Sequence, residues 1–262
     1  MEIVVCIKQV PETTNINWDP RTGTLIREGV PGILNPNDKN VLETALQLKE
    51  KHGGSITALS MGPAQAEEAL REALSMGIDK AILLSDRRFA GADTLATAYA
   101  LSLALKKIPK VDLIVCGEES ADGMTGQVGP QVAEFFDIPQ LTYATEIEIH
   151  GHTIRIKQKL EDCHRILESS LPALITVERG CNIPRIPSME QIMEAYRDKE
   201  VLLWGTGDLE GNSEHFGLIG SPTQCRRVYI YKAERRRVQR LEGKTDEVAR
   251  KLIQLWQQNN LI

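Results

Sequence analysis

Apolar and polar positions follow two different periods along this chain. Short apolar runs bounded by turn residues are separated by longer segments in which apolar residues recur every three or four positions. The first pattern is typical of buried strands and the second of amphipathic helices. Their alternation favours a doubly wound, mostly parallel α/β sheet, Rossmann-like, with helices on both faces. The strands are predicted at 3–8, 56–61, 80–85, 112–117 and 172–178, and the helices at 38–51, 64–75, 93–106 and 127–136.

Residues 140–170 depart from this order. They include "TEIEIHGHTIRIKQKL", in which apolar and polar residues alternate on either side of a His150-Gly151-His152 turn. This alternation predicts an antiparallel hairpin extension of the sheet. The two histidines could be proposed as metal ligands, but their position at a turn favours a solvated tip. We therefore assign no metal site.

The C-terminal part of the chain shows little core of its own. Pro184 and Pro187 make 179–187 an irregular loop that we expect to protrude, before a helix start at which Ser188 and Gln191 have capping-box spacing. Residues 199–223 are glycine-rich and weakly periodic, which predicts a linker, and a helix is predicted from about 245 to 258. A short helix after a long linker is marginal alone, so it is expected to dock on another body. We accordingly divide the chain into an α/β domain at 1–198 and a linker with a C-terminal arm at 199–262.

Composition and charge exclude several classes of protein. The chain has 262 residues and a formal net charge of -5, which gives no electrostatic footprint for nucleic acid. No apolar run is long enough to span a membrane, and "MEIVVCIKQV" lacks the basic start of a secretory signal. The five cysteines are scattered and form no CxxC pair. We therefore expect a reduced, cytoplasmic protein.

The carboxyl ends of the predicted strands are the place where open α/β sheets bind ligands. The segment "GEESADGMTGQVGP" at 117–130 follows the fourth strand there. Gly123, Gly126 and Gly129 let its backbone approach a ligand beside the N-terminus of a new helix. The spacing is neither that of a Walker loop nor that of the GxGxxG fingerprint. The segment is therefore either a nucleotide-binding turn or a plain turn.

The stretch "FAGADTLATAYALSL" at 89–103 offers a second ligand site. Asp93 or Thr94 can cap the helix that starts here, which is a sufficient explanation for one of them. Thr97 lies one turn inside, on the same face as Thr94, so both hydroxyls can donate beside the free N–H groups of the first turn. This arrangement suits a pyrophosphate, although the charge of Asp93 would repel phosphate and suits capping better. An ordinary capped helix remains the alternative.

Serine, histidine and aspartate residues do not cluster into a catalytic set. A nucleotide-hydrolysing or adenylylating enzyme is disfavoured, because it would need a phosphate-binding signature and a base. A stand-alone nucleotide-binding sensor is disfavoured by the protruding loop and by the arm without a core. A nucleotide-binding module that works with a partner is the interpretation the residues favour.

The strand-end segments, taken in order and spacing, resemble the beta (small) subunit of electron-transfer flavoproteins along nearly the whole chain. The matching stretches are "VVCIKQVPET" at 4–13, "LNPNDKNVLETALQLKE" at 34–50, "MGPAQAEEALREALSMGID" at 61–79, "DGMTGQVGP" at 122–130 and "PRIPSMEQIMEA" at 184–195. The resemblance implies an adenine-nucleotide-binding fold in a heterodimer with an alpha subunit that carries FAD. Such a chain is an electron carrier, and an NADH-oxidising flavin site is expected only in the assembled complex.

The resemblance also implies what the beta subunit binds. Ordinary members hold AMP, whereas the bifurcating type, which "GADTLAT" resembles, holds a second FAD that accepts a hydride from NADH. The pair of electrons is then split between a downhill path and an uphill one. The implied partners are a flavin-dependent dehydrogenase of the acyl-CoA, enoyl-CoA or 2-hydroxy-acid type, and ferredoxin or flavodoxin as the low-potential acceptor. AMP in a structural, non-bifurcating subunit is the alternative.

Site residues follow from the same resemblance. A loop for recognition of the dehydrogenase would contain Gly180, Cys181 and Asn182, and the arm would lie on the alpha subunit. Glu118 and Glu119 depart from many relatives and are expected to face solvent or that subunit. The adenosine part would be held by Cys6 (backbone), Asn35, Met61, Asp122 and the turn of Thr125, Gly126, Gln127 and Val128, and the pyrophosphate by Ala92, Asp93, Thr94 and Thr97.

Overall fold

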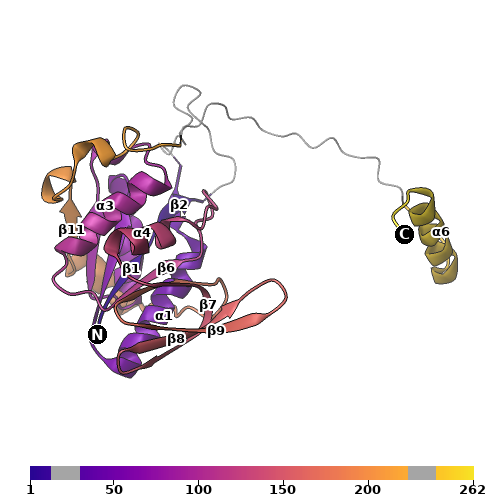
Figure 1. The fold of residues 1–262 in the computed structure, drawn as a ribbon, viewed down its shortest axis with the longest axis horizontal. Coiled ribbons are helices and arrows are strands. Elements are labelled where there is room, and N and C mark those ends of the chain that lie inside the picture. The colour runs from indigo at the N-terminus through magenta and orange to yellow at the C-terminus, as the bar shows by residue number, and fades with distance from the viewer. Residues whose placement is uncertain (13–29, 224–239) are drawn as a thin grey trace. The chain divides into compact units, whose positions relative to one another are not determined.

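The computed structural model describes residues 1–12, 30–223 and 240–262. The chain divides into two compact units, Met1–Arg227 and Val228–Ile262. The first unit is built on a nine-stranded sheet (Figure 1). In spatial order its strands are β11 (Val201–Trp204), β5 (Lys80–Leu84), β4 (Ser55–Met61), β1 (Glu2–Cys6), β6 (Leu113–Gly117), β10 (Ala173–Val177), β7 (Gln140–His150), β8 (Thr153–Lys159) and β9 (His164–Ser170).

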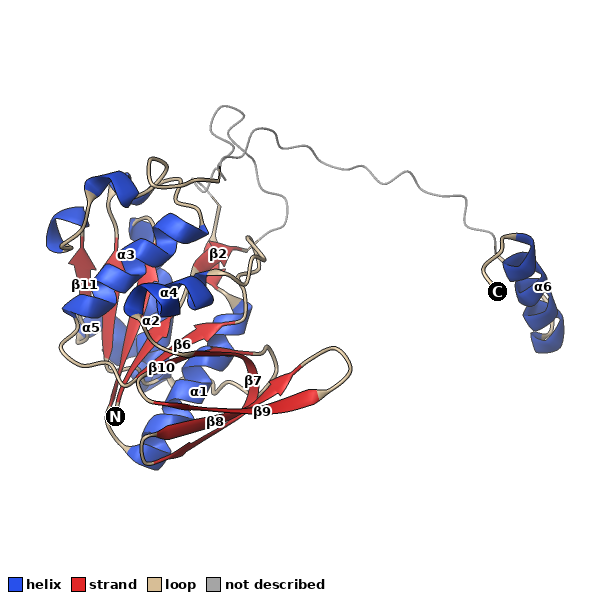
Figure 2. Ribbon diagram, in the orientation of Figure 1, coloured by secondary structure: helices blue, strands red, loops and turns tan. Residues whose placement is uncertain are grey.

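The strands from β11 to β7 pair in parallel, and helices cover both faces of this part of the sheet. Figure 2 shows α3 and α4 side by side on one face. The helices of the first unit are α1 (Pro36–His52), α2 (Glu67–Met76), α3 (Thr94–Lys107), α4 (Val128–Phe136) and α5 (Met189–Arg197). The doubly wound α/β prediction is confirmed, and its five strands and four helices are present with ends shifted by three residues or fewer.

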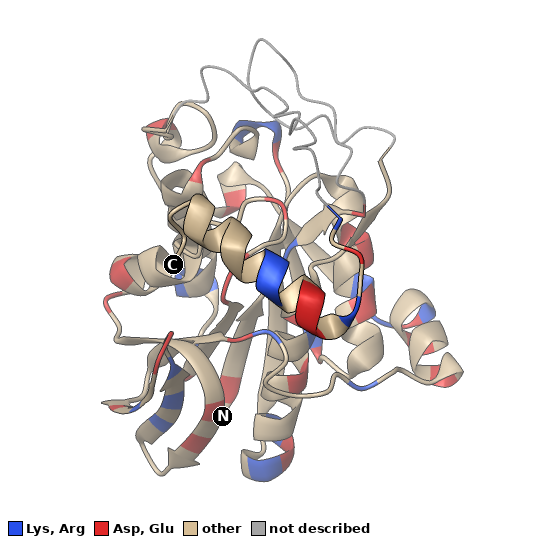
Figure 3. Ribbon diagram, turned by 90° about the vertical axis from the view of Figure 1, so that its right-hand side faces the viewer, with Lys and Arg blue, Asp and Glu red and all other residues tan. Residues whose placement is uncertain are grey.

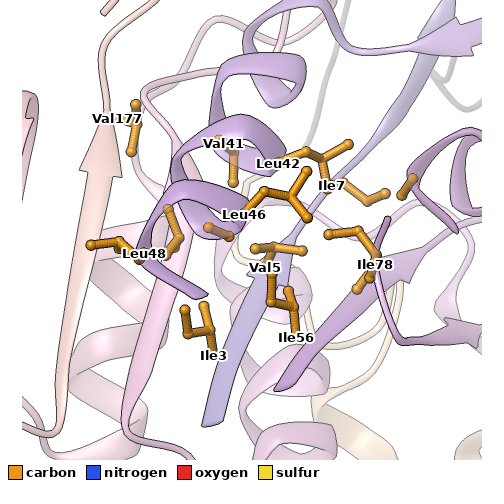
Figure 4. Close-up of a cluster of buried hydrophobic side chains, with 14 of the residues drawn as sticks. Ile3, Val5, Ile7, Val41, Leu42, Leu46, Leu48, Ile56, Ile78 and Val177 are labelled. Atoms are coloured by element: carbon orange, nitrogen blue, oxygen red, sulfur yellow. The ribbon is translucent and has the colours of Figure 1, made fainter. Parts of the chain in front are cut away.

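The central strand β1 is buried on both faces, as its continuous apolar sequence predicts. Ile3 and Val5 pack with α1 and α2 in one hydrophobic cluster, and Val4 packs with α3 and α4 in the other. Figure 4 shows the first cluster, in which Leu42 and Leu46 of α1 lie over the side chains of β1. Burial of a large aliphatic side chain contributes about 1.5–3 kcal/mol, so these two layers fix the sheet and helices as one body.

The antiparallel extension contains three strands rather than the two of the predicted hairpin. β7 and β8 form that hairpin around Gly151, which has a φ of +61°. β9 adds a third strand along β8. The sequence of β9 alternates poorly, and its outer positions are exposed, so the pattern alone did not reveal it.

A short antiparallel pair, β2 (Gln9–Pro11) with β3 (Gly32–Leu34), frames the long connection that follows β1. Pro36 then starts α1 at its first turn, where proline is well tolerated. At α5, Ser188 and Gln191 form the predicted capping box, with both reciprocal hydrogen bonds present.

Most of 199–223, predicted as a linker, is integral to the first unit. β11 pairs in parallel with β5, and the segment continues through short 3₁₀ turns at Thr206–Asp208 and Ser213–His215. Thr206 and Phe216 are buried, and the Phe216 ring packs edge-on against Phe89 at 5.4 Å between centroids. The pattern missed these contacts because single buried residues in short turns carry no period.

The second unit contains α6 (Thr245–Gln258), as predicted. No residue of α6 is buried, although Leu252, Leu255 and Trp256 recur at helical spacing. Figure 3 shows charged residues only in the first half of this helix. Its second half therefore offers an amphipathic surface without charges. Among the described residues, no helix is both long and apolar enough to cross a membrane.

Candidate functional site

The strand order places a topological switch point at the carboxyl ends of β1 and β6, and this position is called the crevice below. α1 connects β1 to β4 along one face, whereas α4 connects β6 to β7 along the other. The connections therefore leave the two neighbouring strands in opposite directions, which is the usual position of a ligand site in such sheets. Cys6 and Cys116 are register partners here, and Gly117 ends β6. Met61 ends β4, half-buried on the same face as Cys6.

One side of the crevice is built by a hydrogen-bond network around Asn35. Its side-chain Nδ2 donates to Asp38 Oδ1 at 2.9 Å and to the Glu119 carbonyl at 3.1 Å. Its Oδ1 accepts from the Ala121 N–H at 3.1 Å. The Asn35 side chain is thus fully used inside the protein and is only 1% exposed. It holds the loop after β6 in place, so its influence on a ligand would pass through that loop.

Asp38 completes this network from the first turn of α1. Its Oδ2 accepts from the Lys8 N–H at 2.7 Å, which ties α1 to the chain just after β1. Burial raises the pKa of Asp38 to about 7, against the opposing effects of the Asn35 side chain and of Lys8. Gly117 is required opposite, because a Cβ there would lie 2.7 Å from Asp38 Oδ1.

Asp122 is placed in the same wall, with its carboxylate largely buried. Lys8 Nζ pairs with Asp122 Oδ1 at 2.6 Å and donates to Ser120 Oγ at 3.3 Å. A buried carboxylate needs such a partner, because desolvation alone disfavours the charge. Lys8 therefore joins the strand end to the loop that the resemblance assigns to adenosine binding.

The two acids after β6 differ in environment. Glu119 is exposed, as expected, while its carbonyl accepts from the side chains of Asn35 and Asn37. Glu118 is half-buried, and burial, followed by the nearby Glu178, raises its pKa above the usual range. The expectation that both acids face solvent or a partner therefore fits Glu119 better than Glu118.

The start of α3 carries the second group of predicted residues. Asp93 is the N-cap, and its Oδ1 accepts from the Ala96 N–H at 3.0 Å. The prediction that Asp93 serves as the cap is confirmed. Thr94 and Thr97 are half-buried, and within the described part of the chain their hydroxyls make no hydrogen bond. The hydroxyls of Thr94 and Thr97 are thus available to a ligand. They lie beside the N-terminus of α3, at the same edge of the sheet as the crevice.

The turn before α4 contains Thr125, Gly126 and Gln127, and Val128 begins the helix. Gly126 has a φ of +61°, a conformation that favours glycine. The Tyr143 hydroxyl lies beside it, 3.7 Å from where a Gly126 Cβ would be. Tyr143 itself has a φ of +55°, which is strained for a bulky residue and is held by its N–H bond to Thr176 Oγ1 at 3.0 Å.

The predicted recognition loop is fastened to α1, less than one turn after Asp38. Asn40 Nδ2 donates to the carbonyl and the side-chain oxygen of Asn182, and the Gly180 N–H donates to Asn40 Oδ1. Arg185 forms an ion pair with the largely buried Glu43 at 2.8 Å and holds the pKa of that acid below its usual range. Cys181 is half-buried, and burial raises the pKa of its thiol.

Beyond this anchor the loop presents large apolar side chains to solvent. Ile183 and Ile186 are 91% and 92% exposed, and Met189 at the start of α5 is 73% exposed. Nearby, Pro187, Ile192 and Tyr196 help to line a hollow of about 380 Å³ between β3, α2 and α5. Contiguous exposed apolar surface of this kind marks interaction sites.

Sequence reasoning missed Lys8 and Asp38, which organise the crevice, and Ser221, which contacts the start of α3. The Ser221 Oγ accepts from the Asp93 N–H at 2.8 Å. The sequence marks Asp38 only as an acid in the first turn of α1, where a negative charge is favoured. No sequence signal existed for Ser221, because it lies 128 positions from its partner.

Comparison with known proteins identifies the family. Residues 22–201 match the electron transfer flavoprotein domain. The chain is 53% identical over 224 residues to the electron transfer flavoprotein subunit beta of Thermoanaerobacterium thermosaccharolyticum, covering 86% of each chain. It is 45% identical over 230 residues to CarD, a subunit of the caffeyl-CoA reductase-Etf complex of Acetobacterium woodii, covering 87% of each. It is 43% identical over 250 residues to protein FixA of Azotobacter vinelandii, covering 93% of this chain and 89% of that one. The chain therefore belongs to the electron transfer flavoprotein family, among its beta subunits.

Proposed function

We propose that this beta subunit binds FAD in the crevice between β1 and β6 and takes part in electron bifurcation with NADH as the donor. The observation that carries the proposal is the pair of hydroxyls of Thr94 and Thr97, which lie on one face at the start of α3 and make no hydrogen bond within the described residues. AMP has no second phosphate to use them, whereas FAD has a pyrophosphate. Residues 92–97 are called the phosphate seat below.

The hydrogen-bond donors at the start of α3 have the chemistry that suits a dinucleotide. Neutral hydroxyls and the N-terminal end of α3 favour an anion, and the turn containing Gly126 lets a backbone approach closely. Leu95, Met124 and Tyr143 are exposed apolar side chains on the segments that flank this edge. When bound, the flavin would supply hydride acceptance and the release of single electrons. The chain's own residues would bind it and orient it.

The partners of the proposed complex follow from two surfaces. The uncharged half of α6 suits docking on the alpha subunit, and the exposed Ile183, Ile186 and Met189 suit docking on a flavin-dependent dehydrogenase of the acyl-CoA, enoyl-CoA or 2-hydroxy-acid type. Ferredoxin or flavodoxin would accept the low-potential electron, and the cytoplasm is the proposed compartment. The relative named as part of a caffeyl-CoA reductase complex supports the coupling to a CoA-dependent reductase.

The test is the nucleotide content of the heterodimer. The complex is produced with its alpha subunit and denatured, and the released FAD and AMP are separated and quantified. The proposal expects about two FAD and no AMP per heterodimer. One FAD with one AMP would overturn it and assign the chain to the structural, non-bifurcating beta subunits.

A further inference from the structure

Residues 217–223, called the arm root below, are fastened onto the segment that leads into α3. The Leu218 N–H donates to the Ala90 carbonyl at 3.0 Å. The Asp93 N–H donates to Ser221 Oγ at 2.8 Å, and the Thr223 N–H donates to Asp93 Oδ2 at 3.0 Å. With a longer bond from Ser221 Oγ to the Gly91 carbonyl at 3.4 Å, four hydrogen bonds join two segments that are distant in sequence.

The arm root packs closely against the segment that precedes α3. Ser221 is 5% exposed, and its hydroxyl also donates to the Gly217 carbonyl at 2.7 Å. Gly217 has a φ of +56°, and a Cβ there would lie 2.1 Å from the Arg88 carbonyl oxygen. Only glycine allows the arm root to approach the backbone before α3 this closely.

The arm root contacts Asp93, whose negative charge makes it unsuited to binding an anion in the phosphate seat. Asp93 Oδ1 accepts from the Ala96 N–H and Oδ2 from the Thr223 N–H, both at 3.0 Å, so each oxygen has a fixed donor. Burial opposes ionisation of this carboxyl, but these donors outweigh it and hold the pKa of Asp93 below its usual range. The negative charge therefore persists at neutral pH, on the residue that directly precedes Thr94.

We infer that Ser221 and Thr223 are positioning residues of the phosphate seat, which hold the Asp93 carboxylate away from a bound second phosphate. The inference rests on the proposed function, because it assumes that residues 92–97 receive that phosphate. Thr223 lowers the pKa of Asp93 through both its N–H and its side chain, and proline at this position would supply neither, so Oδ2 would be free to turn toward the ligand. Repulsion between the Asp93 carboxylate and the phosphate would then weaken binding of the second phosphate selectively.

The experiment uses the heterodimer after removal of its bound nucleotides, with ADP and AMP as probes. ADP differs from AMP by the second phosphate alone, so the ratio of their dissociation constants reports on the phosphate seat. Thr223→Pro removes the N–H donor, and Ser221→Ala is a milder second variant in case the first folds poorly. Ser213→Ala, in an exposed 3₁₀ turn of the same region, is the matched control.

The decisive variant is the double substitution Asp93→Asn with Thr223→Pro. Asparagine is also a good N-cap and carries no charge, so it removes the proposed repulsion without removing the cap. Thr223→Pro should weaken ADP roughly tenfold and AMP less than threefold, and the double variant should restore ADP to within about threefold of the parent. If the arm root merely supports the fold, neutralising Asp93 will not restore ADP binding, and the inference is overturned.

A further pair of results separates this inference from the proposed function. Thr94→Val with Thr97→Val should weaken ADP more than AMP if these residues bind the second phosphate. If that variant binds both nucleotides like the parent, the phosphate seat itself is wrong. If it weakens ADP while Thr223→Pro and Ser221→Ala do not, only the role of the arm root is refuted.

Discussion

Asn40 and Asn182 bind each other in both directions across 142 positions of sequence. The side-chain amide of Asn40 donates to Asn182 Oδ1 at 2.8 Å, and that of Asn182 donates to the Asn40 carbonyl at 3.0 Å. Asn182 also donates to Thr44 Oγ1 at 2.9 Å. One helix, α1, thus carries the loop proposed for partner recognition.

Asn182→Ala is expected to loosen this loop on α1. The substitution removes three partly buried hydrogen bonds and leaves Asn40 only its contacts with the backbone of residues 180 and 182, which should cost about 1–3 kcal/mol of stability. Binding to the dehydrogenase should weaken as well. Ile183→Ala is the control, because an exposed side chain should affect binding but not the unfolding midpoint. Equal stability of both variants would contradict the anchoring role.

The raised pKa of Asp38 predicts a specific pH dependence of stability. Since its folded pKa of about 7 lies above the ordinary value of 3.8, the folded state binds the extra proton between these limits. The contribution is therefore present at low pH and is lost as pH rises toward 7, by at most about 1.4 kcal/mol per unit. Asp38→Asn should remove this part of the slope. Urea unfolding between pH 4 and 8 measures it, and an unchanged slope in the variant would assign the effect to other groups.

Gly117→Ala tests the close fit at the end of β6. A Cβ at this position would lie 2.7 Å from Asp38 Oδ1, so the carboxylate must move and its bonds to Asn35 and Lys8 must stretch. We expect a loss of about 1–3 kcal/mol and weaker nucleotide binding. Gly207→Ala is the matched control, because nothing lies within 4 Å of its added Cβ. Similar behaviour of the two variants would show that the network tolerates displacement.

Thr94→Val with Thr97→Val should reduce FAD retention in the heterodimer. Each substitution removes one hydroxyl donor to charged oxygens at nearly constant volume, for a combined loss of about 2–4 kcal/mol in binding free energy. Flavin released per heterodimer after gel filtration is the measurement. Ser102→Ala, on the same helix but bonded to the Tyr99 carbonyl, controls for general loosening of α3. An unchanged flavin content in the threonine variant would show that both residues only belong to an ordinary capped helix.

Trp256→Ala tests the surface of α6. The side chain is 41% exposed in a helix without buried residues, so its removal should leave the first unit intact. Association with the alpha subunit should weaken by more than about tenfold if the ring is an anchor. Gln257→Ala on the same turn is the polar control. Size-exclusion chromatography at falling protein concentration reads the outcome, and identical profiles would place the docking surface elsewhere.

The sheet was predictable where a strand is buried on both faces, as for Ile3, Val4 and Val5, because a continuous apolar run needs no tertiary information. β11 was not predictable, since Leu202 and Leu203 at its centre are exposed and its stability comes from pairing with β5. The residue types at the crevice could be predicted from the sequence. The sequence did not show that the Asn35 side chain forms its hydrogen bonds within the protein. Hydrogen-bond partners distant in sequence, such as Asp93 and Ser221, leave no local pattern.

α1 is tied at its first turn to the crevice through Asp38 and, less than two turns later, to the recognition loop through Asn40 and Glu43. A helix rises only about 1.5 Å per residue, so these attachments sit on a single rigid rod. Under the proposed function, a shift of the loop backbone to suit a different dehydrogenase would also disturb the wall proposed to hold the nucleotide. A change of partner would then be easiest through outward side chains such as Ile183 and Ile186, which can be replaced without moving that backbone.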